Sequence, residues 1–207
     1  IEASGLRLSF RLTNVGPQSV DFKLAFPHLA GLAVSPAAKD DYYFYPWGGG
    51  IIADAPALIR GGYGDHVTLY QMMDVFSPSR GGGLAMTCGD ADGRYKVLAL
   101  RKRAGGRAEV SAVDRGPPTA PEYVMANSLE AVEGTSMVIE YLRRTRGPGE
   151  SFSPSPASLA AHAGGWKTPF AAYARWCHRA WRFRPHPSAL TGVTNMLAAG
   201  WGQSPLF

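Results

Sequence analysis

The chain has 207 residues, of which 45% are hydrophobic and 18% charged, and this composition excludes an intrinsically disordered protein. The 25 glycines and 16 prolines favour a globular chain rich in strands and turns. The net charge of +5 raises the question of a nucleic-acid partner, but the basic residues are scattered except for two short runs, residues 101–103 and 143–146. Each run ends a strand-like segment, which favours solvated strand ends, so we expect no nucleic-acid partner.

Neither a targeting segment nor a membrane segment is visible in the sequence. No apolar run approaches the length of a membrane span, so we expect no membrane partner. Cys88 and Cys177 lie far apart, which predicts neither a disulfide framework nor a metal site, and we expect no cofactor. Because the chain opens at Ile1 in a strand-like context, we expect a piece of a longer protein. The cellular location of that protein stays open, the extracellular space and the periplasm included.

The first elements in chain order are two strands with alternating apolar and polar residues. Residues 6–15 show this period of two, and residues 20–26 repeat it with the apolar side chains on one face. Gly16, Pro17 and Gln18 break the pattern between them. The sequence therefore predicts that the two strands pair as an antiparallel hairpin.

Later segments repeat this pattern of strands and turns. Residues 67–76 and 83–89 are predicted strands joined by a loop rich in glycine and serine. Residues 90–93 resemble the start of a calcium loop, but the closing Glu is absent, so a turn is predicted there. Further strands are predicted at residues 94–102, 108–114, 123–133 and 137–145. Such strands with short turns predict a mainly β fold, an antiparallel β-sandwich of the supersandwich type over residues 1–150.

The pattern changes after the sandwich. A segment rich in proline and serine leads into a stretch where apolar residues recur every three or four positions, at Phe170, Tyr173, Cys177 and Trp181. This spacing predicts an amphipathic helix with Thr168 as its N-cap. We assign residues 151–190 to a linker with this helix, and residues 191–207 to the truncated start of a following domain.

The segment DDYYFYPWGGG, residues 40–50, is unusually aromatic. In an extended conformation Phe44 would face one side, while Tyr43 and Tyr45 would face the other. Such rings pack at sheet edges and interdomain seams, and they also stack on the faces of sugar rings. The sequence favours packing and leaves ligand contact open. The three glycines lack the helix and the lysine of a phosphate loop, which excludes a nucleotide site of that kind.

No catalytic residue can be assigned from the sequence. Hydrolysis of a glycosidic bond usually takes two flanking carboxylates. Several acids are available, but no spacing pairs any two of them: Asp54, Asp65, Asp74, Asp90 and Glu140. The histidines show no metal-ligand spacing, so no metal site is predicted either.

Three segments taken together resemble a known family. They are DDYYFYPWGGG (residues 40–50), YQMMDVFSPSRGGGLAMTCGDADGRYKVLAL (residues 70–100) and WKTPFAAYARWCHRAW (residues 166–181). In this order they are similar to the N-terminal, galactose-mutarotase-like β-sandwich region of large bacterial glycoside hydrolases, in which a (β/α)-barrel follows. The resemblance covers about residues 20–190.

The resemblance implies a non-catalytic domain that packs against a barrel of the same parent chain and borders the glycan cleft. The barrel would carry the catalytic carboxylates. The residues expected to bind carbohydrate are Tyr43, Tyr45, Trp47 and Asp74. The residues expected at an interdomain seam, left as an exposed apolar patch, are Trp166, Tyr173, Trp176 and Trp181.

Two other functions stay open. The first is a self-contained carbohydrate-binding module that uses Tyr43, Tyr45 and Trp47 as a stacking platform. The second is a mutarotase-like sugar epimerase, which requires a histidine and a carboxylate on one concave sheet. His66 with Asp65 or Asp74 is the candidate set for that chemistry.

Overall fold

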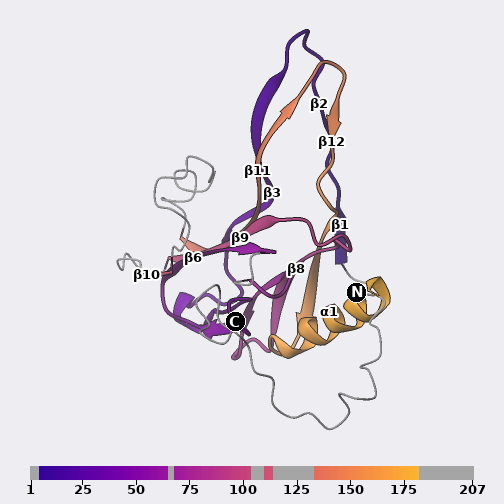
Figure 1. Ribbon diagram of the computed structural model, residues 1–207. Coiled ribbons are helices and arrows are strands. Elements are labelled where there is room, and N and C mark those ends of the chain that lie inside the picture. Colours follow the sequence, from indigo (N-terminus) through magenta and orange to yellow (C-terminus); the bar gives the residue numbers. More distant parts are fainter. Residues whose placement is uncertain (1–4, 65–67, 104–109, 114–132, 182–207) are drawn as a thin grey trace, which may run out of the picture.

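The computed structural model of the protein describes residues 5–64, 68–103, 110–113 and 133–181. Figure 1 shows a body of stacked sheets, one helix beside it and a long arm of two ribbons that projects from the body. The predicted fold class is confirmed, because the structure is a mainly antiparallel β-sandwich with one helix after its last strand.

The strands form three sheets. The first has six strands in the order β1 (Gly5–Leu8), β13 (Ala157–Ala163), β8 (Gly82–Cys88), β7 (Met72–Ser77), β4 (Tyr42–Tyr45) and β5 (Ile51–Ala53). The second has five strands in the order β10 (Val110–Val113), β6 (Ala57–Tyr63), β9 (Lys96–Arg103), β11 (Gly134–Arg146) and β3 (Val20–Leu32). The third pairs β12 (Ser151–Phe152) with β2 (Leu12–Thr13). All neighbours are antiparallel except β10, which runs parallel to β6.

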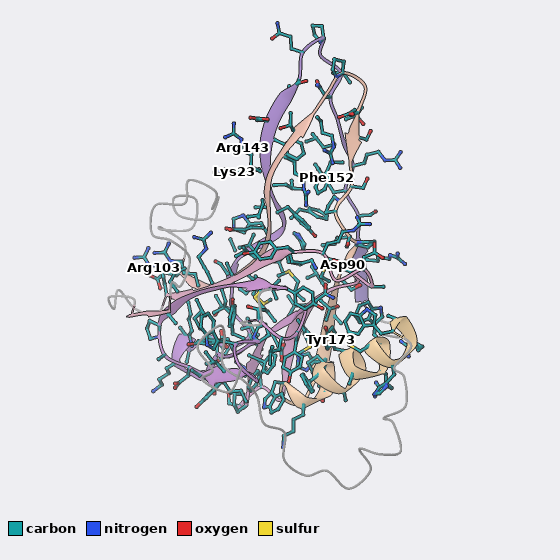
Figure 2. The ribbon with its side chains drawn as sticks, viewed as in Figure 1. Lys23, Asp90, Arg103, Arg143, Phe152 and Tyr173 are labelled. Atoms are coloured by element: carbon teal, nitrogen blue, oxygen red, sulfur yellow. The ribbon has the colours of Figure 1, made fainter. Side chains whose placement is uncertain are left out.

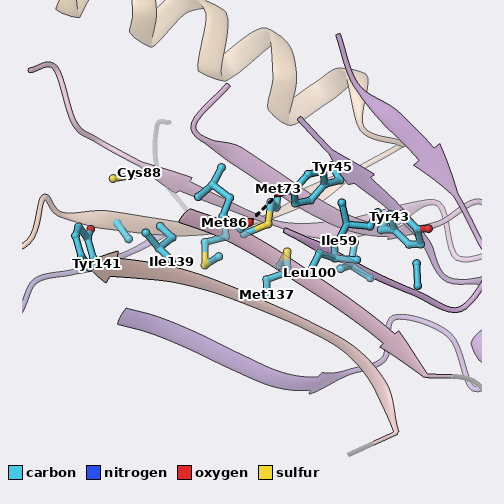
Figure 3. Packing of buried hydrophobic residues seen from close by; sticks show 14 of the residues in the cluster. Tyr43, Tyr45, Ile59, Met73, Met86, Cys88, Leu100, Met137, Ile139 and Tyr141 are labelled. Carbon is cyan, nitrogen blue, oxygen red and sulfur yellow. Dashed lines mark hydrogen bonds between the residues drawn. The ribbon is translucent and has the colours of Figure 1, made fainter. Parts of the chain in front are cut away.

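The main core lies between the two large sheets (Figure 3). Alternate residues of each strand point into it, as Met73 and Val75 do on β7 and as Leu98 and Leu100 do on β9. This burial of alternate apolar side chains supplies the main driving force for stacking the sheets. Strand β7 is buried along its whole length, because its other face is covered as well.

Helix α1 (Lys167–Ala180) lies on that other face of the six-stranded sheet. A second, smaller core forms there from Phe44 and Met72 of the sheet and Tyr173 of the helix. The helix begins at Lys167, and its N-cap position is Trp166, which makes no side-chain capping hydrogen bond. The prediction of Thr168 as the N-cap is therefore wrong by two residues. A short 3-10 helix, η1 (Ala38–Asp40), precedes β4.

The arm consists of the outer halves of β3 and β11 together with the β2–β12 pair (Figure 1). The ring of Phe152 on β12 holds the two ribbons together. Its centroid lies 5.7 Å from that of Phe22 on β3 and 5.9 Å from that of Tyr141 on β11. Figure 2 shows Phe152 between the ribbons.

The predicted pairing of the first two strands is wrong. Residues 6–15 form β1 and β2, which pair with β13 and β12, and residues 20–26 belong to β3, which pairs with β11. A period of two identifies a strand but does not select its neighbour. The strands predicted at residues 67–76 and 83–89 correspond to β7 and β8, which pair with each other.

The predicted linker also needs correction. Residues 157–163 are not a connection, because they form β13 between β1 and β8 in the six-stranded sheet. The sandwich therefore extends past residue 150. The predicted strand at residues 123–133 and the predicted start of a following domain at residues 191–207 lie outside the described residues, apart from residue 133.

Candidate functional site

The aromatic strand β4 lies inside the fold. Tyr43 and Tyr45 point into the main core, with 3% and 0% of their surface exposed, and the Tyr45 hydroxyl donates a hydrogen bond to the carbonyl of Leu98, 2.8 Å away. A sugar-stacking platform needs an exposed ring face. The structure therefore corrects the assignment of these two rings as carbohydrate ligands. Trp47 is half-buried and packs against the same core.

Asp74 is fully buried on the face of β7 that points away from the main core. Its Oδ1 atom lies 2.9 Å from Nε2 of His162 on β13, two strands away. Gly83 of the intervening β8 leaves room for this pair, because a Cβ atom there would lie 2.7 Å from His162 Nε2. A carboxylate buried in this way does not reach a ligand at the surface, so the prediction of Asp74 as a carbohydrate ligand is corrected too.

The Asp74–His162 pair sets the charge of the imidazole. Burial alone would lower the pKa of His162, but the hydrogen bond to Asp74 and its negative charge outweigh burial and raise that pKa above its ordinary value. Neither residue lines either of the two pockets described below. Asp65 and His66, the other members of the predicted epimerase set, lie outside the described residues, and that set stays a prediction.

The expected seam residues of α1 pack largely against the chain's own sheet. The Trp166 ring stacks on Phe44 of β4, with centroids 5.4 Å apart and planes at 6°. Tyr173 is buried, and its hydroxyl accepts a hydrogen bond from the backbone N–H of Gln71, 3.0 Å away. The aromatic stripe predicted as an exposed patch is therefore mainly the contact that holds α1 on the sandwich.

The C-terminal part of this aromatic stripe, Trp176 and Trp181, is less buried than Tyr173. Trp176 stacks on Tyr173, with centroids 5.6 Å apart, and meets Trp181 edge-on at 5.3 Å. The indole N–H of Trp181 donates a hydrogen bond to the carbonyl of Ala91, 2.7 Å away, which ties the end of the helix to the turn before β9. Trp176 is thus held in place from two sides while it remains only half-buried.

A pocket of about 270 Å³ opens where α1 meets the edge of the six-stranded sheet; we call it the helix-edge pocket. Its lining residues are Gly5, Arg7, Thr87, Cys88, Gly89, Pro156, Ser158, Tyr173 and Trp176.

Three polar side chains of this pocket form one row across neighbouring strands. Arg7 of β1 is the direct partner of Ser158 of β13, and Ser158 is the direct partner of Thr87 of β8. Directly opposed residues point to the same face of a sheet. The row therefore presents a guanidinium and two hydroxyl groups to one pocket, whose other wall carries the Trp176 indole.

A buried polar cluster contacts two residues that line this pocket, because Gln71 bonds to Tyr173 and Cys88 through its backbone. Nζ of Lys96 donates to Oδ2 of Asp90 at 2.7 Å and to Oε1 of Gln71 at 2.9 Å, and it also lies 4.5 Å from the centroid of the Tyr63 ring. Burial would raise the pKa of Asp90, but the hydrogen bond and the charge of Lys96 lower it below its ordinary value. The side-chain amide of Gln71 donates to the carbonyl of Asp90 at 2.8 Å. The cluster fixes the turn that receives Trp181.

All four buried carboxylates of the described chain are engaged by the fold. Asp41 accepts hydrogen bonds from the backbone N–H groups of residues 34 and 35. Asp74, Asp90 and Glu140 each face a basic side chain, and the last of them lies 2.6 Å from Nη2 of Arg60. These acids act as structural anchors, and none of them lines the helix-edge pocket or the second pocket described below.

Among residues 5–64, 68–103, 110–113 and 133–181, no group of three His, Cys, Asp or Glu side chains is placed to hold a metal ion. Within those ranges no helix has the length and the apolar character needed to cross a membrane.

No protein-family model matches the chain, and no curated protein matches it significantly.

Only some residues of the helix-edge pocket could be identified from the sequence. Tyr173 and Trp176 stand out through their helical spacing. Arg7, Thr87 and Ser158 carry no such signal, because only the pairing of β1, β13 and β8 brings them together.

Proposed function

We propose that this β-sandwich is a non-catalytic domain of a carbohydrate-active glycoside hydrolase and that it binds a saccharide at the helix-edge pocket. The observation that carries the proposal is the row of Arg7, Ser158 and Thr87 beside the half-buried indole of Trp176. An aromatic face and a row of hydrogen-bonding groups complement the apolar face and the hydroxyl groups of a sugar ring.

The size and the surroundings of the pocket agree with this use. A volume of about 270 Å³ is near the lower end of ligand pockets, which suits one or two sugar rings better than a long chain. Trp176 is pre-oriented by Tyr173 and Trp181, so little side-chain freedom is lost on binding.

The proposed partner is a catalytic barrel of the same parent chain. This part of the proposal rests on the resemblance of residues 40–50, 70–100 and 166–181 to hydrolases in which a barrel follows the sandwich. It agrees with the role of the buried carboxylates, which pair with basic side chains inside the fold and do not line either pocket.

A self-contained carbohydrate-binding module is the second candidate. It would use the same row of polar side chains beside Trp176, with no contact from a second domain. Under this alternative the chain alone binds glycan with its full affinity, whereas under the leading proposal the attached barrel adds contacts to the same glycan.

Calorimetric titration of the 207-residue chain with a panel of neutral mono- and disaccharides tests the site. Trp176→Ala should weaken binding by about tenfold or more, as the loss of a central aromatic contact does elsewhere. Trp47→Ala is the matched control, because it removes the same side chain from the segment that the sequence singled out, and it should leave affinity unchanged in the folded fraction. Binding by none of the panel, or loss of binding in the Trp47 variant alone, would overturn the proposal.

A further inference from the structure

A second pocket lies at the base of the arm, away from Trp176; we call it the arm pocket. It has a volume of about 390 Å³. Its lining residues are Arg94, Tyr95, Tyr141, Arg144, Arg146, Ser151, Phe152, Ser153, Pro154 and Ser155.

The arm pocket is strongly basic. Arg144 and Arg146 lie two positions apart on β11 and therefore on one face of the strand, with their guanidinium carbons 5.4 and 5.5 Å from the centroid of the Phe152 ring. Arg94 contributes a third guanidinium group at the rim, where it pairs with the exposed Asp92. No Asp or Glu lines the pocket, so its lining side chains carry only positive charge.

The opposite face of β11 behaves differently. Arg143 and Thr145 point there and both bond to the carboxylate of Asp21 on β3. The basic run at residues 143–146, which the sequence indicates as a solvated strand end, is thus divided by the period of the strand. Arg143 forms an exposed ion pair with Asp21, whereas Arg144 and Arg146 line the arm pocket.

Two of the residues that line the pocket carry a buried polar atom. The hydroxyl of Tyr141, a residue only 5% exposed, lies beside the Cys88 thiol, and Nε of Arg144 is buried without a hydrogen-bond partner in the described chain. Burial, and next the nearby Cys88, raise the pKa of Tyr141, so its hydroxyl keeps its proton and stays a donor. A buried polar group left without a partner costs about 1–3 kcal/mol, and an ordered water or ion can supply the missing partner.

We propose that the arm pocket binds an acidic saccharide, with a carboxylate of the sugar held by Arg144 and Arg146. Arg146 already donates from Nε to the carbonyl of Ser151 at 3.1 Å and from Nη1 to the carbonyl of Thr145 at 2.7 Å, which holds its guanidinium group in place. A carboxylate accepts hydrogen bonds from the guanidinium N–H groups that remain, and two adjacent positive charges attract it strongly. This inference rests on the geometry of the arm pocket and does not depend on the helix-edge pocket.

A bare anion or a nucleic acid fits this pocket less well. The volume exceeds what a single oxyanion fills, and the walls add the rings of Tyr95 and Phe152 and the hydroxyls of three serines, Ser151, Ser153 and Ser155. Sugar rings use both kinds of contact. A nucleic acid is held by phosphate contacts spread along a strand, whereas the arginines here converge on one pocket.

Calorimetric titration of the 207-residue chain with trigalacturonate tests the inference, with a neutral galactose trisaccharide and sodium sulfate as comparison ligands. Arg144→Gln and Arg146→Gln should each weaken trigalacturonate binding by about tenfold or more, because a charged hydrogen bond is lost. Arg143→Gln removes the same charge from the other face of β11 and should change the affinity by less than about twofold.

Three results would overturn the inference. The first is an equal effect of Arg143→Gln and the two pocket variants, which would mean attraction by net charge alone. The second is binding of sulfate or of the neutral trisaccharide as tightly as trigalacturonate. The third is loss of trigalacturonate binding in Trp176→Ala, which would place the acidic sugar in the helix-edge pocket instead. If Trp176→Ala binds trigalacturonate normally and no neutral sugar binds the chain, the proposed function fails while this inference stands.

Discussion

Asp74 and His162 face each other across Gly83, with the carboxylate Oδ1 atom 2.9 Å from the imidazole Nε2 atom and both side chains almost fully buried. The pair connects β7 to β13 over the strand between them. It lies on the side of the six-stranded sheet that points away from the main core, the side that also carries α1.

The first prediction concerns the pKa of His162. In the wild-type chain the charge of Asp74 holds this pKa above its ordinary value against the opposing effect of burial. Asp74→Asn removes the charge and leaves burial dominant, so the pKa should fall below about 6.5. Titration of the imidazole signals by NMR measures both values. An unchanged pKa in the variant would show that Asp74 does not control the imidazole.

The same pair makes a prediction about stability and pH. A histidine whose pKa is raised on folding adds stability that is fully present below its unfolded value of about 6.5. That stability is lost as the pH rises through the higher folded value. The free energy of unfolding should therefore decrease over this window in the wild type, and the decrease should be absent in Asp74→Asn. Urea denaturation at a series of pH values tests this, and equal slopes for both proteins would contradict it.

Gly83 should tolerate no side chain. A Cβ atom there would lie 2.6 Å from the carbonyl oxygen of Val75 and 2.7 Å from His162 Nε2. Gly83→Ala should cost about 1–3 kcal/mol of unfolding free energy, as overpacking does in other proteins. Gly165→Ala is the control, because its Cβ would lie 3.5 Å from the Phe76 ring, an ordinary contact. Equal stabilities of the two variants in chemical denaturation would refute the steric account.

Lys96 should be essential for stability near neutral pH. Lys96→Met leaves the buried Asp90 without its cation, and breaking a buried pair in this way costs about 3–5 kcal/mol. The pKa of Asp90 is lowered on folding, so the stability it adds is present above about pH 4 and is lost as the pH falls through its folded value. The gap between variant and wild type should therefore narrow in acid. The exposed Lys39→Met is the control, and a gap that stays constant down to pH 3 would contradict the assignment.

The sequence predicts the local elements better than their partners. Alternation identified β7 and β8, and helical spacing identified α1, because each pattern is confined to one segment. The partners of β1, β2 and β3 lie at the far end of the described chain, and no local signal points to them. Strand β13 escaped prediction because its small residues, with alanine at four of seven positions, show little alternation.

The candidate sites were also hard to predict, because they depend on contacts between distant segments. The rings of β4 drew attention by their number, yet they are buried because both faces of the central strands are covered. The two pockets instead combine residues from distant segments, such as Arg7 with Ser158 and Arg94 with Arg144. Only the register of the strands brings such residues together.

The most direct test of the central claim is an NMR titration that follows the indole N–H signals of the five tryptophans as a neutral saccharide is added. Binding at the helix-edge pocket should shift the signal of Trp176, with a smaller change at its neighbour Trp181, and should leave Trp47 and Trp166 in place. A shift of the Trp47 signal with Trp176 unmoved would contradict the claim and return the binding site to the aromatic segment at residues 40–50.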